Sequence, residues 1–526
     1  MEVEALSSNS KTPTFVLSLP LHYNGVQRHR LDKQFESCHK LTNLLIADRK
    51  KALFEAEKTR IWRSAKECIA ELYKAQPDKE QWGKEQLAAY DEYCEALNAQ
   101  QEKFGLSKYS FYNRINRFRK HYPIVNSRIA QMVAKHVWEK FDTYLFGSGE
   151  EIRFIPWDKF FSIEGNDNST GIIFRKDKMS VTFYGMDIPI EPKHRFTEYE
   201  KEALDSKKHR VKYCRIVRIW HKRGWLYRLQ FALEGTPPDK GRILGNSRVG
   251  VDIGTQTVAV VGKDNVALDE LADKANTPER ELRRINRAMD RSRRAMNPEF
   301  YSADGTIIPK NKLPKELLTY RGKRKWKESK HYKELASQRR YLYARIARLR
   351  KNQHLTLANK YIAYGDTFFV EKMKFSALAK KAKKQTEEEV KANHGKHKRR
   401  KRFGKSVANK APAMFLTILK KKVESLGGSF SEIDTAKAKA SQYNHVTKTY
   451  TKKPLSKRWN DDIGGYRVQR DLYSAFLIMN TNSKLDGFDH RRCRGSFKKF
   501  IALHDAEIKR LTTIHTPSSM GISKAA

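Results

Sequence analysis

Hydrophobic and polar positions change their period along the chain, and the change marks separate regions. From about residue 31 to 146, apolar side chains recur at helical spacing, as Leu41, Leu44 and Leu45 do. From residue 152 to 234 the period falls to two, and turn residues separate short alternating segments. The stretch 14–21 alternates weakly as well. The pattern predicts one N-terminal strand, then a helical region, and then a small β-barrel.

The most apolar run, residues 249–262, predicts a β-hairpin at the centre of a further sheet. Asp252 lies inside its first strand. A buried carboxylate is costly unless it is paired or binds a metal. Aspartate also caps turns through its side chain. This run alone leaves the metal ligand and the turn cap equally open.

Two later acids favour the metal ligand. Glu371 ends a short apolar strand predicted over 366–373, and Asp471 lies in the first turn of a helix predicted over 467–480. An acid inside one strand, one at the end of a second strand and one on a helix form a recurring way to hold two Mg²⁺ ions. Hard cations bind carboxylate oxygens, and two metals activate a water and stabilise the leaving oxygen of a phosphodiester.

These stretches resemble, in order, the three RuvC motifs of TnpB transposon proteins and type V CRISPR effectors. The residues that carry the resemblance are Gly250-Val251-Asp252-Ile253-Gly254, Val370-Glu371-Lys372-Met373 and Arg470-Asp471-Leu472-Tyr473-Ser474-Ala475. By motif it covers residues 247–480. The resemblance implies an RNA-guided DNA endonuclease with an RNase H-like nuclease domain. It also implies that Asp252, Glu371 and Asp471 are catalytic and hold two Mg²⁺ ions, for which Mn²⁺ can substitute.

The charge of the chain fits such partners. Lysine plus arginine total 106 against 60 acids, a formal net charge of +46, whereas a small soluble domain carries about 2 to 8. Nucleic acid is the expected polyanion, and the resemblance specifies a guide RNA and target double-stranded DNA with a short adjacent motif. No apolar run of about 18 residues is present to span a membrane, and no signal peptide is visible. Five scattered cysteines favour a reducing, intracellular compartment. The resemblance further implies a cytoplasmic, prokaryotic protein that joins the nucleoid when bound to DNA.

Several basic and aromatic residues are candidates for nucleic-acid contact. Aromatic and basic residues are interleaved over 103–122, and the resemblance places a recognition lobe there; an amphipathic helix with an aromatic core face is the alternative. In the β-rich region two arginines of one strand either contact phosphates or form a solvated face. An arginine-rich helix after residue 277 favours a polyanion groove. Two arginines before the third acid either bind the scissile phosphate or pair with the acids. The candidates, in that order, are Tyr112, Asn113, Arg114, Asn116 and Arg117; Arg215 and Arg218; Arg283 and Arg287; Arg467 and Arg470.

The sequence departs from the family between residues 436 and 466, where relatives usually carry a zinc ribbon with two cysteine pairs. No cysteine remains there, and His445, Asp461 and Asp462 do not provide four ligands at zinc spacing. We therefore expect no zinc, and a segment that keeps its hairpin shape without the metal.

The expected fold is multidomain α+β: a helical recognition lobe, a small β-barrel wedge domain and an RNase H-like α/β nuclease domain. The expected segments are 1–30, N-terminal tail and first wedge strand; 31–148, helical recognition domain; 149–240, β-barrel wedge domain; 241–378, RuvC domain with a basic helical insertion; 379–410, basic lid or tether; 411–435, RuvC continued; 436–466, degenerate zinc ribbon; 467–526, third RuvC motif and basic C-terminal tail.

Two other functions remain open at this point. One is an RNA-guided DNA-binding protein that acts by occupancy with little cleavage. The other is a protein-only RNase H-like nuclease or transposase, which would need no structured RNA. The sequence leaves the guide, the adjacent motif and the oligomeric state undefined.

Overall fold

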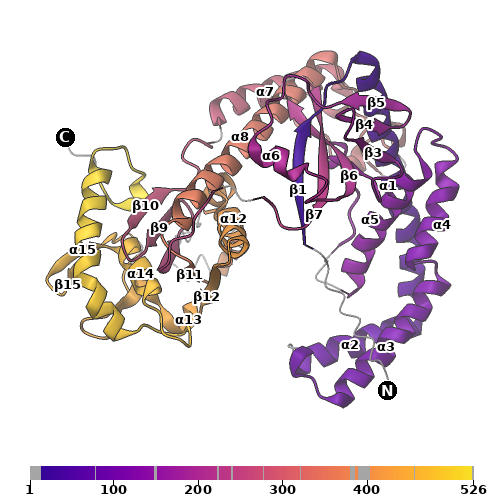
Figure 1. Ribbon diagram of the computed structural model, residues 1–526. Helices are drawn as coiled ribbons and strands as arrows, with labels where there is room; N and C mark the ends of the chain where they lie inside the picture. The colour runs from indigo at the N-terminus through magenta and orange to yellow at the C-terminus, as the bar shows by residue number, and fades with distance from the viewer. Residues whose placement is uncertain are drawn as a thin grey trace. The chain divides into compact units, whose positions relative to one another are not determined.

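The computed structural model of the protein describes residues 13–76, 79–146, 151–221, 224–238, 241–276, 278–319, 322–379, 386–388, 403–454 and 456–523. The chain forms two compact units, Met1–Lys240 and Gly241–Ala526, and the fold is mixed α/β (Figure 1). Among the described residues, no helix combines the length and the apolar character needed to cross a membrane. The two units are described separately below.

The helical periodicity of the first unit is confirmed. Asn24 starts the first helix by accepting a hydrogen bond from the Gln27 backbone N–H at 2.8 Å. Leu31, Phe35 and Cys38 then bury one face of this helix. The helices are α1 (Gly25–Glu57), α2 (Arg60–Ala75), α3 (Lys84–Lys103), α4 (Lys108–Arg119), α5 (Ser127–Phe146) and α6 (Glu198–Ala203).

The strands predicted for a barrel form two sheets in this unit. One has the order β1-β7-β6-β2 and the other β3-β4-β5, and an isolated bridge between Leu21 and Ile190 links them. The N-terminal strand pairs antiparallel with β7, as the alternation at 14–21 predicts. The strands are β1 (Thr14–Pro20), β2 (Ser162–Glu164), β3 (Ile172–Arg175), β4 (Ser180–Phe183), β5 (Met186–Pro189), β6 (Val211–His221) and β7 (Gly224–Glu234). Strands and helices share one hydrophobic core.

A five-stranded mixed sheet organises the second unit, with the order β10-β9-β8-β11-β12. The predicted hairpin is confirmed: β8 and β9 are antiparallel, and β10 continues the meander. Strand β11 runs parallel to both β8 and β12. The strands are β8 (Arg248–Ile253), β9 (Thr257–Val261), β10 (Val266–Glu270), β11 (Thr367–Glu371) and β12 (Ser429–Ile433).

Helices cover both faces of this sheet. Val249, Val251 and Ile253 pack against α8 (Lys330–Ile362) and α12 (Pro412–Ser425). On the other face, Ala259, Val261 and Phe369 pack against α14 (Arg470–Met479) and α15 (His490–Thr512). Because strand residues alternate between faces, the positions between Val249, Val251 and Ile253 face α14.

An arginine-rich helix, α7 (Glu279–Met296), pairs with α8 through a small core of Leu282, Ile285, Met289, Tyr332, Leu335 and Leu342. The start of α7 at Glu279 agrees with the arginine-rich helix that the sequence predicts after residue 277. Of the predicted lid or tether, residues 380–385 and 389–402 lie outside the described residues; short helices, α9 (Phe375–Ala379) and α11 (Phe403–Lys410), flank them.

The predicted zinc-free segment contains two hairpins. They are formed by β13 (Tyr443–Asn444) with β14 (Thr449–Tyr450), and by β15 (Trp459–Ile463) with β16 (Tyr466–Gln469); a short helix, α13 (Thr435–Ala438), precedes them. The helix predicted to start at residue 467 starts at Arg470 instead. The reason is that the backbone up to Gln469 pairs with β15, with Trp459 opposite Gln469.

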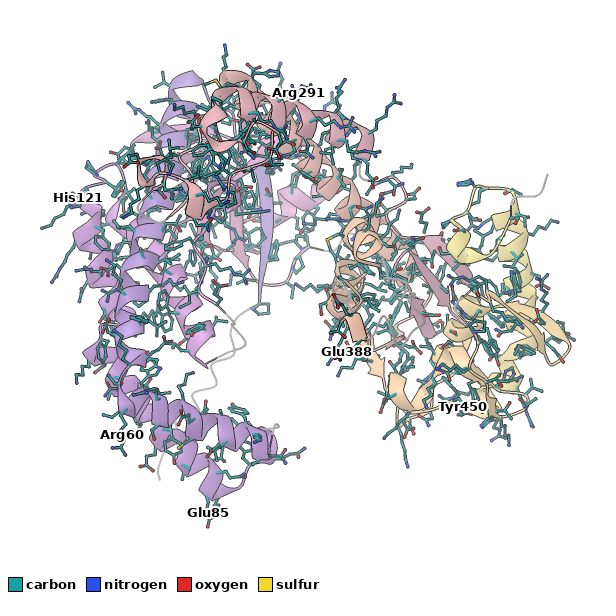
Figure 2. All side chains as sticks on the ribbon, turned by 180° about the vertical axis from the view of Figure 1, so that it is seen from behind. Arg60, Glu85, His121, Arg291, Glu388 and Tyr450 are labelled. Atoms are coloured by element: carbon teal, nitrogen blue, oxygen red, sulfur yellow. The ribbon has the colours of Figure 1, made fainter. Side chains whose placement is uncertain are left out.

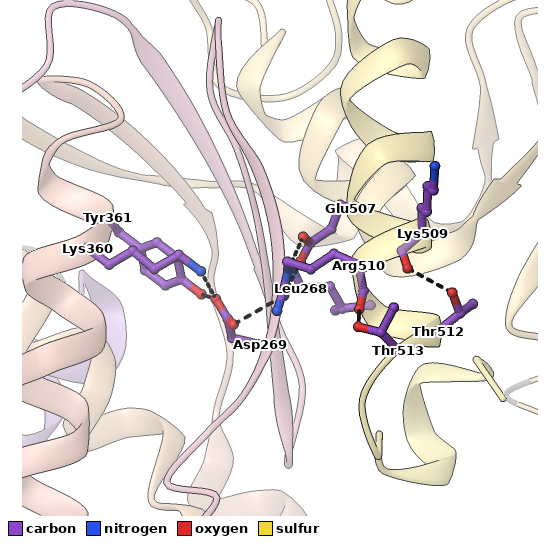
Figure 3. A network of polar contacts seen from close by, with 9 residues as sticks. All are labelled: Leu268, Asp269, Lys360, Tyr361, Glu507, Lys509, Arg510, Thr512 and Thr513. Carbon is purple, nitrogen blue, oxygen red and sulfur yellow. Dashed lines mark hydrogen bonds and ion pairs between the residues drawn. The ribbon is translucent and has the colours of Figure 1, made fainter. Parts of the chain in front are cut away.

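A polar network ties three elements of the second unit together (Figure 3). Asp269 of β10 accepts hydrogen bonds from Lys360 Nζ at 2.6 Å and Tyr361 Oη at 2.7 Å, both from α8. Glu507 of α15 accepts from the Leu268 backbone N–H at 2.9 Å and from Arg510 Nε at 2.6 Å. The network therefore fixes α8 and α15 on opposite sides of the same edge strand.

Candidate active site

The register of two parallel strands places the first two acids side by side. Val251 of β8 pairs with Val370 of β11, and the next residues along the two strands are Asp252 and Glu371. Neighbouring strands lie about 4.8 Å apart. Phe369, two residues before Glu371, belongs to the face covered by α14. Both carboxylates therefore project toward α14.

Gly250 lets α14 lie directly on β8. A Cβ at this position would lie 2.0 Å from the Ala475 carbonyl oxygen and 2.3 Å from the Met479 nitrogen, so no other residue type fits. Asp471 precedes Ala475 by one helical turn and shares its face. Asp252 follows Gly250 by two residues and shares its side of the strand. The contact at Gly250 thus aligns the helix so that Asp471 faces Asp252.

Both ends of α14 are held as well. At the start, the Gln469 side chain accepts from the Leu472 N–H at 2.8 Å, and the Gln469 N–H donates to His504 Nε2 at 3.0 Å. At the end, Arg248 of β8 donates to the Met479 carbonyl at 3.0 Å and to the Thr481 carbonyl at 2.8 Å. Three alternate residues of β8 therefore lie along one helix: Arg248 at the end of α14, Gly250 at its middle and Asp252 at its beginning.

The electrostatics agree with three converging carboxylates. Burial, followed by the charges of Asp471 and Glu371, raises the pKa of Asp252 well above its ordinary value. Burial also raises the pKa of Glu371, while a hydrogen bond from the Ala440 backbone N–H opposes that rise. Neighbouring negative charges and burial both disfavour the ionised form of a carboxyl group. A cation bound among these acids would therefore stabilise their ionised, carboxylate form.

Arg470 supplies one positive charge at this place. Its Nε and Nη2 atoms lie 3.1 Å and 3.0 Å from Asp471 Oδ1, and the two side chains are 11% and 15% exposed. Of the two roles left open for Arg470, pairing with an acid is the one seen. Arg467 is exposed, and its guanidinium lies 4.8 Å from the centre of the Trp459 ring.

The donor set suits a hard divalent cation, although the ligands do not stand at coordination distances. Carboxylates are the groups that Mg²⁺ prefers, and the buried Ser474 hydroxyl lies within hydrogen-bonding reach of the Asp252 carboxyl. Throughout the described ranges, no three His, Cys, Asp or Glu side chains stand in an arrangement that would already hold a metal ion.

Sequence reasoning missed Ser474, Ala440, Arg248 and Gln469 as parts of the site. Ser474 and Gln469 lie within three residues of Asp471, so proximity could have marked them. Arg248 lies on the same strand face as Asp252, which strand alternation could have indicated. Ala440 has no such signal, because its contact to Glu371 is made by backbone and depends on the fold.

The candidates on α4 divide into exposed and structural residues. Asn113, Asn116 and Arg117 are exposed. Tyr112 is partly buried against the core of the first unit, with its ring edge-on to the exposed Tyr109. Arg114 donates to both oxygens of Asp48, at 2.9 Å and 2.6 Å, which favours the structural interpretation for that residue.

The phosphate-contact prediction for Arg218 is wrong. Its side chain is 1% exposed and donates to the carbonyls of Phe160 at 2.8 Å and Trp157 at 2.6 Å. The guanidinium lies 3.7 Å and 4.0 Å from the ring centres of Trp157 and Trp225. The Arg218 guanidinium is therefore surrounded by aromatic rings, through cation–π contacts, and by backbone carbonyl groups in place of water. Arg215 is partly exposed and pairs with Glu164 at 3.4 Å.

Arg283 and Arg287 are exposed on α7, as a polyanion groove requires. Together with Arg280, Arg284 and Arg291 they line a hollow on the surface of this helix. Arg291 is labelled in Figure 2, which shows the dense cover of long side chains around it.

The sequence and the structure were both compared with those of known proteins. No family model matches the chain, and no curated protein matches it. Among solved structures, the chain is similar to the Cas12f1–sgRNA–target DNA complex, with a TM-score of 0.35 and 11% identity over 89% of this chain and 99% of that chain. It is also similar to a CRISPR–Cas12f ternary complex, with a TM-score of 0.25 and 12% identity over the same shares. Scores this low carry no argument about function.

Proposed function

We propose that the protein is an RNA-guided DNA endonuclease with a single RuvC-type site formed by Asp252, Glu371 and Asp471. The observation that carries this proposal is the convergence of these acids, from β8, β11 and α14, on one face of the sheet. A five-stranded mixed sheet between helical layers is compatible with an RNase H-like domain. The formal charge of +46 supports a polyanionic partner.

The three carboxylates would hold two Mg²⁺ ions, or Mn²⁺, which supply Lewis acidity toward a phosphodiester. Asp252 and Glu371 would present their oxygens from adjacent strands, and Asp471 from the first turn of α14. Ser474 offers a hydroxyl beside Asp252. Arg470 would leave Asp471 as the cations bind, which frees its guanidinium to contact the phosphate of the substrate.

The guide RNA and target duplex belong to the same proposal. The helices of residues 31–148 and the sheets of residues 149–240 would hold the guide and read the short motif beside the target, while base pairing reads the remaining sequence. Sequencing the RNA that co-purifies with the protein, expressed with its native flanking locus, tests this part. A discrete RNA with a constant scaffold supports it, and heterogeneous RNA or none favours a protein-only nuclease.

The chemistry is tested by replacing one carboxylate at a time. Asp252→Ala, Glu371→Ala and Asp471→Ala should each lower Mg²⁺-dependent cleavage of a guide-matched plasmid by more than about 100-fold, because loss of an outer-shell partner alone costs 10- to 100-fold. Binding of RNA, measured by filter retention, should stay within about twofold. A D252A protein that still cuts at the normal rate would exclude this site.

Binding by occupancy without useful cleavage has one observation in its favour. The pairing of Arg470 with Asp471 and the lack of preformed metal-ligand spacing among the described residues both fit a slow or inactive centre. The plasmid assay separates the two functions, since an occupancy protein binds the matched target and leaves it intact.

A further inference from the structure

The connection between α7 and α8 contains the same structural unit twice. Residues 299–308 begin Glu-Phe-Tyr-Ser and residues 316–325 begin Glu-Leu-Leu-Thr. The Ser302 N–H donates to Thr306 O at 2.9 Å, and the Thr319 N–H donates to Lys323 O at 2.7 Å. Ile308 N donates to Phe300 O, and Lys325 N to Leu317 O, both at 2.9 Å. Gly305 and Gly322 supply the positive φ, 75° and 64°, that each turn needs.

The two copies differ in charge. The first contains Glu299 and Asp304 and no lysine or arginine, whereas the second ends in Lys323-Arg324-Lys325. Asp304 accepts from the Thr306 N–H at 3.1 Å and the Thr306 hydroxyl at 2.9 Å, and contacts with Ser302 and Thr306 lower its pKa. The polar groups of the first turn thus hydrogen-bond with one another, and the turn carries a negative charge. The first turn is therefore unsuited to binding an anion.

The first copy supports the second one. Arg324 donates to the Ile308 carbonyl, and the Trp326 ring packs edge-on against Phe300 with centres 4.8 Å apart. Asn297 is fully buried; it donates to the Lys327 carbonyl at 2.9 Å and accepts from the Lys327 N–H at 2.7 Å. These contacts join the described residues of the second copy to the first copy and to the end of α7.

A group of lysines from this connection is left without acidic partners. Lys310, Lys312, Lys315 and Lys323, here called the lysine loop, are all exposed, and none of them forms an ion pair within the part of the chain that the structure describes. Four exposed lysines within fourteen residues of sequence, with no ion-pair partner among the described residues, offer a local positive charge to a polyanion. The exposed arginines of α7 extend the same charge along the neighbouring helix.

We propose that the lysine loop binds the phosphodiester backbone of a nucleic-acid duplex. Sites for single strands add aromatic side chains on which bases stack. The described rings of this connection, Phe300, Tyr301 and Trp326, instead pack against one another. Lysines act as point charges toward phosphates. The lysine loop therefore binds the backbone of a duplex without recognising its base sequence. This inference goes beyond the carboxylate centre and requires none of its chemistry.

The test uses the full-length protein in EDTA, so that cleavage plays no part. The quadruple variant K310Q/K312Q/K315Q/K323Q is compared with the unsubstituted protein for binding to a fluorescent 30-bp DNA duplex and to an RNA–DNA hybrid of the same length. Fluorescence anisotropy between 50 and 200 mM salt gives the slope of log K against log salt. Loss of four phosphate contacts should reduce this slope by about 3 to 4. The probe whose slope changes more identifies the duplex that the loop binds.

A control variant removes the same charge elsewhere in the second unit. K420Q/K421Q/K498Q/K509Q changes exposed lysines of α12 and α15 and should alter the slope by less than about 1. Equal changes in both variants, or no change in the lysine-loop variant with its circular dichroism intact, would overturn the proposal. Neither outcome affects the carboxylate experiment, which is read in cleavage.

Discussion

At the scale of single residues, the site depends on small features of one strand. The positions of Asp252 within a strand and Glu371 at the end of a strand were predictable, because a carboxylate inside or at the end of an apolar run stands out from the sequence. The burial of Arg218 was not predictable. A basic residue that alternates with apolar residues gives the same sequence pattern whether it lies on a solvated face or between aromatic rings. What distinguishes the two is the position of Trp157 and Trp225, which only the tertiary structure fixes.

Gly250 gives the sharpest prediction at this scale. Gly250→Ala should lower the free energy of unfolding by about 1 to 3 kcal/mol or more, because the added Cβ would overlap backbone atoms of α14. Urea unfolding of the full chain measures it. Gly254→Ala is the matched control from the same motif, since its nearest neighbour would be the Thr257 carbonyl at 3.6 Å, an ordinary contact. Equal stability of the two variants would contradict the described packing of α14 on β8.

At the scale of elements, period and turn residues predicted the β8–β9 hairpin and the strand β11 close to their actual bounds. The start of α14 was misplaced, because the pairing of residues 466–469 with β15 overrides a helical pattern that continues through them. The two hairpins of residues 443–469 were expected only in outline. The first hairpin packs on α14 through His445, and this role of His445 could not be inferred from its spacing in the sequence.

His445 fixes the first of these hairpins to α14. It is buried, its Nδ1 lies 2.8 Å from Tyr473 Oη, and burial lowers its pKa to about 4. The unfolded chain therefore takes up a proton near pH 6.5 and the folded chain only near pH 4. This contribution is complete above pH 6.5 and is lost as the pH falls toward 4, by about 3 kcal/mol at most. Urea unfolding at pH 7 and pH 4.5 measures the loss.

The variant His445→Gln should show a smaller loss between these two pH values than the unsubstituted protein. The raised carboxyl pKa values of Asp252 and Glu371 act in the opposite direction and cancel in this comparison. His331→Gln, at an exposed histidine of α8, is the control and should leave the pH dependence unchanged. An unchanged loss in H445Q would mean that other groups govern acid stability.

At the scale of the whole molecule, the linker at residues 235–240 was a recognisable boundary, and two compact units meet there in the sequence. Their cores are separate: one cluster contains residues 15–233, and the remaining clusters of described residues begin at Val249. We expect residues 241–526 to fold alone, with a cooperative melting transition and native-like circular dichroism. A truncated protein that is unfolded while the full chain is folded would show that the units depend on each other.

The contact between β8 and α14 also has a consequence for biosynthesis. The strand that carries Asp252 is synthesised well before the helix that carries Asp471, because most of the second unit lies between them in the sequence. Since Gly250 and Arg248 have no helix to meet until then, the carboxylates cannot converge on a nascent chain. A translation product truncated before α14 would therefore retain most of the strands of the sheet and lack both Asp471 and the helix that packs on Gly250.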